Sequence, residues 1–402
     1  VMKLHRSCLT QSVQAKQRFK SSISHDYVDN LNDQLLIARL VSVVRGKQSW
    51  KVAFRDPSLS TFKPNHVEEV LIRTLDNPRL ALRFFNFLGL HLNFNHSTLS
   101  FCVLAHSLVD ANLFWPASSL LQTLAHRGLD PGEVFDELWD CFRRFRFKSS
   151  ASFDILIQNC LASSRVFDGV LVFKRMKTCG LAPDARTSTT LLNALVRIRC
   201  FEIVLNLFDE IPALKVKPDA YILSAVVQSL CELKRFEEAR EIAQTNADVV
   251  LYNIFIHGLC KCKRVQEAIE IKNELPRRGL KPDKITFCSL ILGLCRVEQF
   301  DVCLQVIDEM LVFGFLPSEA AVSSVVEGLR RRGKVTTAFE LVRKMGDFGC
   351  VPTLFVYNAL INSLCKNGRF DDAEFLFEGM ENKGLSANDI SYSIVIDSFC
   401  RR

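Results

Sequence analysis

A repeat of 35 residues constrains the fold of this chain more than any other feature of its sequence. Four glycines lie 35 residues apart, and a proline follows each of the first three glycines after three residues. A column of small residues keeps the same period. The three columns are Gly279, Gly314, Gly349 and Gly384; Pro282, Pro317 and Pro352; and Ala268, Cys303, Ala338 and Ala373. Because these residue types share one period and one phase, we infer an array of similar structural units.

The phase of the repeat divides the second part of the chain into intervals. These are 150–184, 185–219, 220–248, 249–283, 284–318, 319–353 and 354–388, followed by a partial unit, 389–402. The unit 220–248 is six residues shorter than the period, and the deficit lies in its second half.

Each unit has the pattern of two helices. In 249–283, apolar residues recur at helical spacing in two stretches on either side of the polar segment 261–264. These residues are Tyr252, Ile256 and Leu259, then Ala268, Ile271 and Leu275. A glycine tolerates the left-handed conformation that ends a helix, so Gly279 marks the end of the second one. A single helical hairpin cannot bury both faces, so we predict an all-α fold, a right-handed α-solenoid of helix-turn-helix repeats.

The region before residue 150 does not keep the period. Residues 64–149 have helical patterns and are predicted to form a divergent N-terminal cap of the array, while 26–63 is expected to be a partly disordered linker with one helical stretch. The sequence has no apolar run of the length that a membrane span needs.

Residues 1–25 differ in composition from the rest of the chain. They carry five Lys or Arg residues, several serines and no acidic residue, and they lack the apolar stretch of a secretory signal. This composition predicts an organelle transit peptide, for the mitochondrion or alternatively the chloroplast; a basic terminus without a targeting role is the other reading. The formal net charge is +7, so removing these five cations leaves +2 for the repeats and cap. Phosphate attraction alone is therefore a weak indication of nucleic-acid binding.

The segments VVLYNIFIHGLCKCKRVQEAIEIKNELPRRGLKPD (249–283) and LFVYNALINSLCKNGRFDDAEFLFEGMENKGLSAN (354–388) closely resemble the pentatricopeptide repeat of plant organelle proteins. The resemblance is strong over 150–402 and weak over 64–149. No HxE motif with a CxxC, as in a zinc-dependent deaminase, is present. The chain therefore resembles the P-class, which does not edit RNA. The resemblance implies sequence-specific binding of single-stranded organellar RNA, which would support transcript processing, stabilisation, splicing or translation by occupancy.

In that family each repeat addresses one nucleotide. The resemblance implies that residues 5 and 35 of each unit face the base, and that residue 2 packs against neighbouring bases. The implied base-reading pairs are Asp154 with Asp184, Thr189 with Asp219, Ser224 with Asp248, Asn253 with Asp283, Cys288 with Ser318, Ser323 with Thr353 and Asn358 with Asn388, and Ser393 begins the partial unit. The implied stacking residues are Arg186, Tyr221, Val250, Ile285, Ala320, Phe355 and Ile390. Within the family, Thr189/Asp219 favours guanine, Asn253/Asp283 uracil and Asn358/Asn388 cytosine.

Other readings of these residues stay open. The terminal Asp of a unit could cap the following helix, and both roles could hold at once. A protein-binding scaffold of the tetratricopeptide type, with 34-residue units, is the alternative function. Cysteines recur at one repeat position, as Cys260 and Cys295 do, which is typical of small apolar packing rather than of a metal site. No catalytic motif stands out, so we expect no enzyme activity, catalytic residue, cofactor or metal, and a monomer whose protein partners the sequence does not name.

Overall fold

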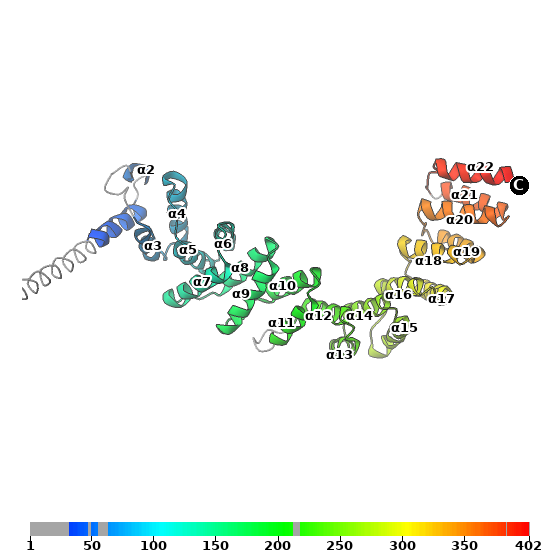
Figure 1. Ribbon diagram of the computed structural model, residues 1–402, viewed down its shortest axis with the longest axis horizontal. Helices are drawn as coiled ribbons and strands as arrows, with labels where there is room; N and C mark the ends of the chain where they lie inside the picture. The colour runs from blue at the N-terminus through cyan, green and yellow to red at the C-terminus, as the bar shows by residue number, and fades with distance from the viewer. Residues whose placement is uncertain (1–31, 47–49, 55–62, 212–217, 383, 402) are drawn as a thin grey trace, which may run out of the picture. The chain divides into compact units, whose positions relative to one another are not determined.

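The computed structural model describes residues 32–46, 50–54, 63–211, 218–382 and 384–401 (Figure 1). All regular secondary structure in these residues is helical. The described residues divide into two compact units, the first ending at Ala194 and the second starting at Leu195. The predicted transit peptide, residues 1–25, lies outside the described residues.

The first unit holds the helices before the regular repeats and the first repeat itself. Within the segment expected to be a partly disordered linker, residues 32–45 and α2 (Trp50–Ala53) are helical. The ring of Trp50 meets Phe84 and Phe87 edge-on, so this segment packs on the helices that follow. These helices are α3 (Pro64–Arg73), α4 (Pro78–Leu92), α5 (Thr98–Asp110), α6 (Phe114–His126), α7 (Pro131–Phe145), α8 (Ala151–Ala162) and α9 (Val166–Thr178), followed by α10 (Ala185–Arg197), in which the unit boundary falls.

Helix α5 is the centre of the first unit. It packs against α3, α4, α6, α7 and α8, and ten of its consecutive residues, Ser100 to Val109, are buried. The buried ring of His106 bonds through Nε2 to the Leu138 carbonyl and through Nδ1 to the Ser152 hydroxyl. One helix touching five others differs from regular stacking, which agrees with the loss of the 35-residue period in this region.

The second unit consists of helical hairpins. Its helices are α11 (Phe201–Glu210), α12 (Ala220–Glu232), α13 (Phe236–Asn246), α14 (Val249–Lys261), α15 (Val265–Glu274), η3 (Pro276–Arg278), α16 (Lys284–Arg296), α17 (Phe300–Val312), α18 (Glu319–Arg331), α19 (Val335–Asp347), α20 (Leu354–Lys366), α21 (Phe370–Asn382) and α22 (Asp389–Arg401).

The helices of the second unit stack in register. The first helices pack on one another in the order α12, α14, α16, α18, α20, α22, and each of them from α12 to α20 also packs on its own second helix (Figure 1). A continuous row of first helices, covered on one side by second helices, is the arrangement of an α-solenoid. The predicted fold class of stacked helical repeats is therefore confirmed.

Two columns of small residues explain this stacking. Ala268, Cys303 and Ala338, on the second helices, have no exposed surface, which permits close contact with the first helix of the same repeat. Gly279 ends its repeat with φ at 75°, a left-handed conformation in which a side chain would be strained. Gly314, Gly349 and Gly384 share this conformation, so the period of the glycines is the period of the helix ends.

Candidate functional site

The residues at position 2 of the repeats form an exposed row on the first helices. In the second unit, the exposed fractions lie between 55% and 73% for Tyr221, Val250, Ile285, Phe355 and Ile390, and Ala320 is also exposed; Arg186, in the first unit, is exposed as well. Large apolar side chains that recur at one exposed position indicate a surface that a ligand covers. The position suits stacking, because each side chain stands at the start of its helix.

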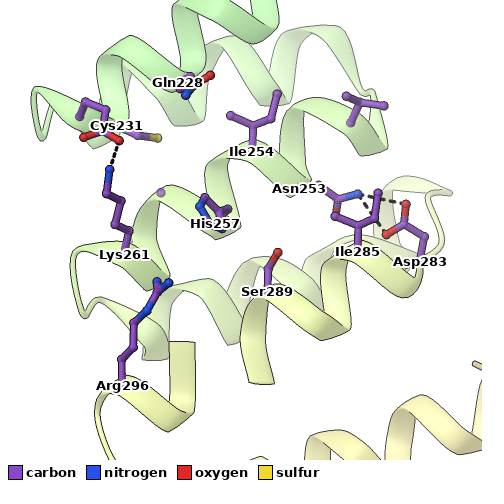
Figure 2. Close-up of a pocket in the computed structure, with 13 residues that line it drawn as sticks. Gln228, Cys231, Asn253, Ile254, His257, Lys261, Asp283, Ile285, Ser289 and Arg296 are labelled. Atoms are coloured by element: carbon purple, nitrogen blue, oxygen red, sulfur yellow. Dashed lines mark hydrogen bonds and ion pairs between the residues drawn. The ribbon is translucent and has the colours of Figure 1, made fainter. Parts of the chain in front are cut away.

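The pair Asn253 and Asp283 comes together at the two ends of one repeat, 249–283. Asn253, at position 5 of α14, is 5% exposed, and its Nδ2 donates to both carboxylate oxygens of Asp283 at 3.0 Å (Figure 2). Thr286 Oγ1, on α16, donates to Asn253 Oδ1 over 2.6 Å. Asp283 also caps α16, since it accepts from the Thr286 backbone N–H at 2.8 Å. Capping and pairing with Asn253 therefore hold together at this residue.

The pair Asn358 and Asn388 has the same arrangement. Asn358 is 7% exposed, and its Nδ2 donates to Asn388 Oδ1 at 3.3 Å. Ser391 Oγ donates to Asn358 Oδ1 over 2.7 Å, and the Ser391 backbone N–H donates to Asn388 Oδ1 over 3.0 Å. The cap bond turns the Asn388 oxygen toward the helix, so the nitrogen of Asn358 faces that oxygen.

Asp154 and Asp184 form a different pair. Asp154, 7% exposed, accepts through Oδ1 from the Asp184 backbone N–H at 2.9 Å. Burial raises the pKa of Asp154 to about 6, although the Asp184 backbone N–H and the Thr187 hydroxyl lower it, and the Asp184 carboxylate raises it further. Asp154 thus changes its charge near neutral pH, unlike the amides in the other two clusters.

In the pair Ser224 and Asp248, each side chain bonds to backbone atoms. Ser224 donates to the carbonyl of Ala220 in its own helix, and Asp248 caps α14 by accepting from the Val250 N–H at 2.9 Å. Thr189 lies in the first unit and Asp219 in the second, so this pair stays a prediction; Asp219 caps α12.

In the repeats that begin at 284 and 319, the two base-reading positions hold small side chains. Cys288 is half-buried, and Ser318 caps α18 by accepting from the Ala321 N–H at 3.3 Å. Thr353 is exposed and makes no side-chain cap bond to α20, whereas Ser323 is half-buried. Ser393 is exposed, and its hydroxyl donates to the carbonyl of Asp389.

A pocket of about 510 Å³ lies along α12, α14 and α16 of the second unit and contains the Asn253 cluster. Asn253, Asp283 and Ile285 lie at one end of it, and Lys261 and Arg296 lie at the other (Figure 2). Val250 also lines the pocket, so two position-2 residues and one base-reading pair share it.

Several residues that line this pocket are not among the predicted site residues. His257 and Lys261 follow Asn253 at intervals of four residues, and both line the pocket with Gln228, Ser289 and Arg296. The spacing of four residues, which brings side chains onto one face of a helix, was the signal that could have found them. Burial lowers the pKa of His257, and the charges of Arg296 and Lys261 lower it further, which favours the neutral imidazole.

Position 13, at the end of each first helix, holds a cation in the last five repeats: Lys261, Arg296, Arg331, Lys366 and Arg401. Lys261 forms an ion pair with Glu232, and Arg331 with Glu327. A cation near the C-terminal end of a helix is stabilised by the helix dipole, so this row also serves the helices.

Within the described ranges, no group of three or more His, Cys, Asp or Glu side chains is placed to hold a metal ion. The fourteen cysteines of the same ranges are free thiols. None of the helices built from these residues has the length and apolarity to span a membrane.

Family models of the pentatricopeptide repeat match the chain between residues 247 and 401. The PPR repeat family matches residues 247–296 and 352–401, the pentatricopeptide repeat domain matches 305–368, and the PPR repeat matches 285–315. The matched residues form the helices from α14 to α22.

Several similar proteins come from Arabidopsis thaliana. The putative pentatricopeptide repeat-containing protein At5g59900 is 52% identical over 180 residues, which cover 44% of this chain and 20% of that protein. The mitochondrial protein At1g66345 is 24% identical (53% of this chain, 39% of that protein), and the chloroplastic protein At4g19440 is 31% identical (42% and 21%). The chain spans between a fifth and two fifths of the length of these relatives.

Among solved structures, the maize pentatricopeptide repeat protein PPR10 is 17% identical to this chain, with a TM-score of 0.42 over 91% of this chain and 61% of that one. The crystal structure of PPR10 in complex with an 18-nt psaJ RNA element has a TM-score of 0.44, at the same identity and coverage.

Proposed function

Because the chain is a plant pentatricopeptide repeat protein, we propose that it binds single-stranded RNA along its row of first helices. The base-reading pairs and the position-2 residues would take one nucleotide per repeat. The chain would act by occupancy, holding an RNA segment and performing no chemistry on it, as expected for a P-class protein. Its substrate would be an organellar transcript, since named relatives are mitochondrial or chloroplastic; we propose the mitochondrion for this chain.

One observation carries this proposal. The exposed side chains of Val250 and Ile285 line the same pocket as Asn253, whose amide is oriented by a carboxylate. Apolar side chains such as these can pack against the two faces of a base, and the aromatic side chains at the same position, Tyr221 and Phe355, can stack on one for about 1–3 kcal/mol per base. An amide offers a donor and an acceptor to the edge of that base. The pocket therefore has the two kinds of contact that a nucleobase needs.

The charges at the far end of the pocket support the same ligand. Lys261 and Arg296 lie away from Asn253, beyond His257. A nucleotide with its base edge at Asn253 would direct its phosphate toward cations of this kind. Such contacts make RNA affinity fall as salt rises. A peptide ligand bound through apolar contacts would show a smaller salt effect.

The experiment that tests this function replaces Asn253 by Thr. Selection from a randomised RNA pool should show that the wild-type chain prefers uracil at one nucleotide, and that Asn253→Thr moves this preference toward guanine by about tenfold, or about 1.4 kcal/mol. Preferences at other nucleotides should stay unchanged, because each repeat addresses its own base.

The matched control makes the same substitution away from the pocket. Asn246, at the exposed end of α13, donates to the Ile242 carbonyl of its own helix, and Asn246→Thr should leave every base preference unchanged. A wild-type chain that enriches no RNA would contradict the proposed function. Enriched RNA with no change in Asn253→Thr would contradict the assignment of this base-reading pair.

A further inference from the structure

Three hydroxyl side chains lie behind the base-reading residues, each at position 3 of the following repeat. They are Thr187, Thr286 and Ser391, and their exposed fractions are 0%, 0% and 1%. Each bonds to the position-5 residue of the repeat before it: Thr187 to Asp154, Thr286 to Asn253 and Ser391 to Asn358. The same contact therefore occurs three times across repeat boundaries.

The amide of Asn253 faces one way because the Asp283 carboxylate binds its nitrogen and the Thr286 hydroxyl holds its oxygen. Its Nδ2 points to the Asp283 carboxylate, which only accepts hydrogen bonds, and its Oδ1 receives the Thr286 hydroxyl over 2.6 Å. A flipped amide would place its oxygen against the carboxylate and its nitrogen against the hydroxyl. The carboxylate, which cannot donate, therefore sets the orientation, and the Thr286 hydroxyl, which can donate or accept, completes it by donating to Oδ1.

The hydroxyl occurs only where position 5 is long enough to reach it. The repeats with Asp or Asn at position 5 are followed by Thr or Ser. The repeats with a shorter residue there are followed by an apolar side chain: Thr189 by Ile222, Ser224 by Leu251, Cys288 by Ala321 and Ser323 by Val356.

The repeat with Ser323 shows the consequence of an apolar position 3. Val356 offers no hydrogen bond, and among the described residues the buried hydroxyl oxygen of Ser323 has no partner. Ser224 instead bonds to the carbonyl of Ala220 in its own helix. Positions 5 and 3 of consecutive repeats are thus matched in both size and polarity.

We propose that Thr187, Thr286 and Ser391 are positioning residues, which orient the base-reading side chain of the preceding repeat and thereby set its base preference. This inference rests on the proposed function, because a base is what the oriented amide would read. Each such nucleotide would then depend on three residues from two consecutive repeats.

The test removes the hydroxyl without changing the volume of the side chain. Thr286→Val should reduce the preference for uracil at the nucleotide of repeat 249–283 by about tenfold, while all other nucleotides keep theirs. Thr286→Ser retains the hydroxyl and should keep the preference. The probe is a randomised single-stranded RNA pool, selected on the whole chain and on each variant, with thermal unfolding measured alongside. Ser391→Ala and Ser391→Thr repeat the comparison at the next cluster.

The outcomes separate the inference from the proposed function. Loss of one preference in Thr286→Val, with recovery in Thr286→Ser, supports the positioning role. An unchanged preference in Thr286→Val, while the wild type selects RNA, overturns the positioning role alone. Uniform loss of binding at every nucleotide also overturns it, since this is the effect of a purely structural residue. A wild-type chain that selects no RNA overturns the proposed function and this inference together.

Discussion

Burying an asparagine amide costs free energy unless each of its polar atoms finds a partner. Asn253 and Asn358 meet this requirement in the same way, with a carboxylate or amide from position 35 and a hydroxyl from position 3 of the next repeat. The position-2 residues are exposed instead of buried: Tyr221 and Phe355 leave more than two thirds of their surface exposed. The surface at Asn253 and at Asn358 thus combines a buried, hydrogen-bonded amide with exposed side chains at position 2.

Residues of the first unit make its stability depend on pH. Burial lowers the pKa of His96 and His106 from 6.5 to about 4, despite hydrogen bonds that raise it. Between pH 4 and pH 6.5, both imidazole rings stay neutral in the folded chain, whereas in the unfolded chain they bind protons. Stability is therefore highest above pH 6.5 and falls as pH drops toward 4, by about 3 kcal/mol for His106. Asp154, with a pKa raised to about 6, acts in the opposite direction over the same range.

Tryptophan fluorescence can measure this effect, because Trp50, Trp115 and Trp139 all lie in the first unit. The urea midpoint reported by this fluorescence should be lower at pH 5 than at pH 7.5. The Asp154→Asn variant should show a larger decrease, since it removes the compensating proton uptake. Equal midpoints at both pH values in that variant would show that the histidines do not stay neutral.

At the scale of the helix, close approach is what sets the stacking of repeats. A Cβ built on Gly258 would lie 2.6 Å from Cys231 on the preceding first helix, and one on Gly293 would lie 2.6 Å from Cys260. Glycine on one helix and cysteine on its neighbour thus form one contact. This contact accounts for Cys231 and Cys260 as small packing residues.

Gly258→Ala should therefore destabilise the second unit. The added methyl group meets the buried Cys231 side chain, and overpacking of this kind costs about 1–3 kcal/mol. Gly379→Ala is the matched control, because nothing lies within 4 Å of its Cβ, and alanine should stabilise α21 by up to about 1 kcal/mol. Thermal unfolding followed by circular dichroism should shift in opposite directions for the two variants; a shared direction would contradict the close approach.

The sequence predicted the helical hairpins because apolar spacing and glycine position are local properties. Gly279 has the left-handed conformation that its place in the period required. The role of Thr286 was not predictable in this way, since its contact with Asn253 joins residues 33 positions apart and depends on the stacking itself. His257 and Lys261 were not predicted because they lie at none of positions 2, 5 and 35, although they share a helix face with Asn253.

At the scale of the whole molecule, the row of first helices in the second unit combines three features on one element type. Exposed apolar side chains stand at position 2, polar clusters at position 5 and cations at position 13. The stacking from α12 to α22 brings these positions together on successive first helices, with the amide clusters at Asn253 and Asn358 and the cations from Lys261 onward. A low net charge outside residues 1–25 means that affinity must come largely from the base contacts, not from a general phosphate attraction.

The most direct test of this account is to map where bound RNA touches the chain. RNA selected from a randomised pool and carrying 4-thiouridine would be cross-linked by light to the whole chain, and the modified residues identified by mass spectrometry. The account predicts cross-links on the first helices, above all at Tyr221 and Phe355, which high salt during binding reduces. Cross-links concentrated on the second helices, such as α13 or α19, would contradict it.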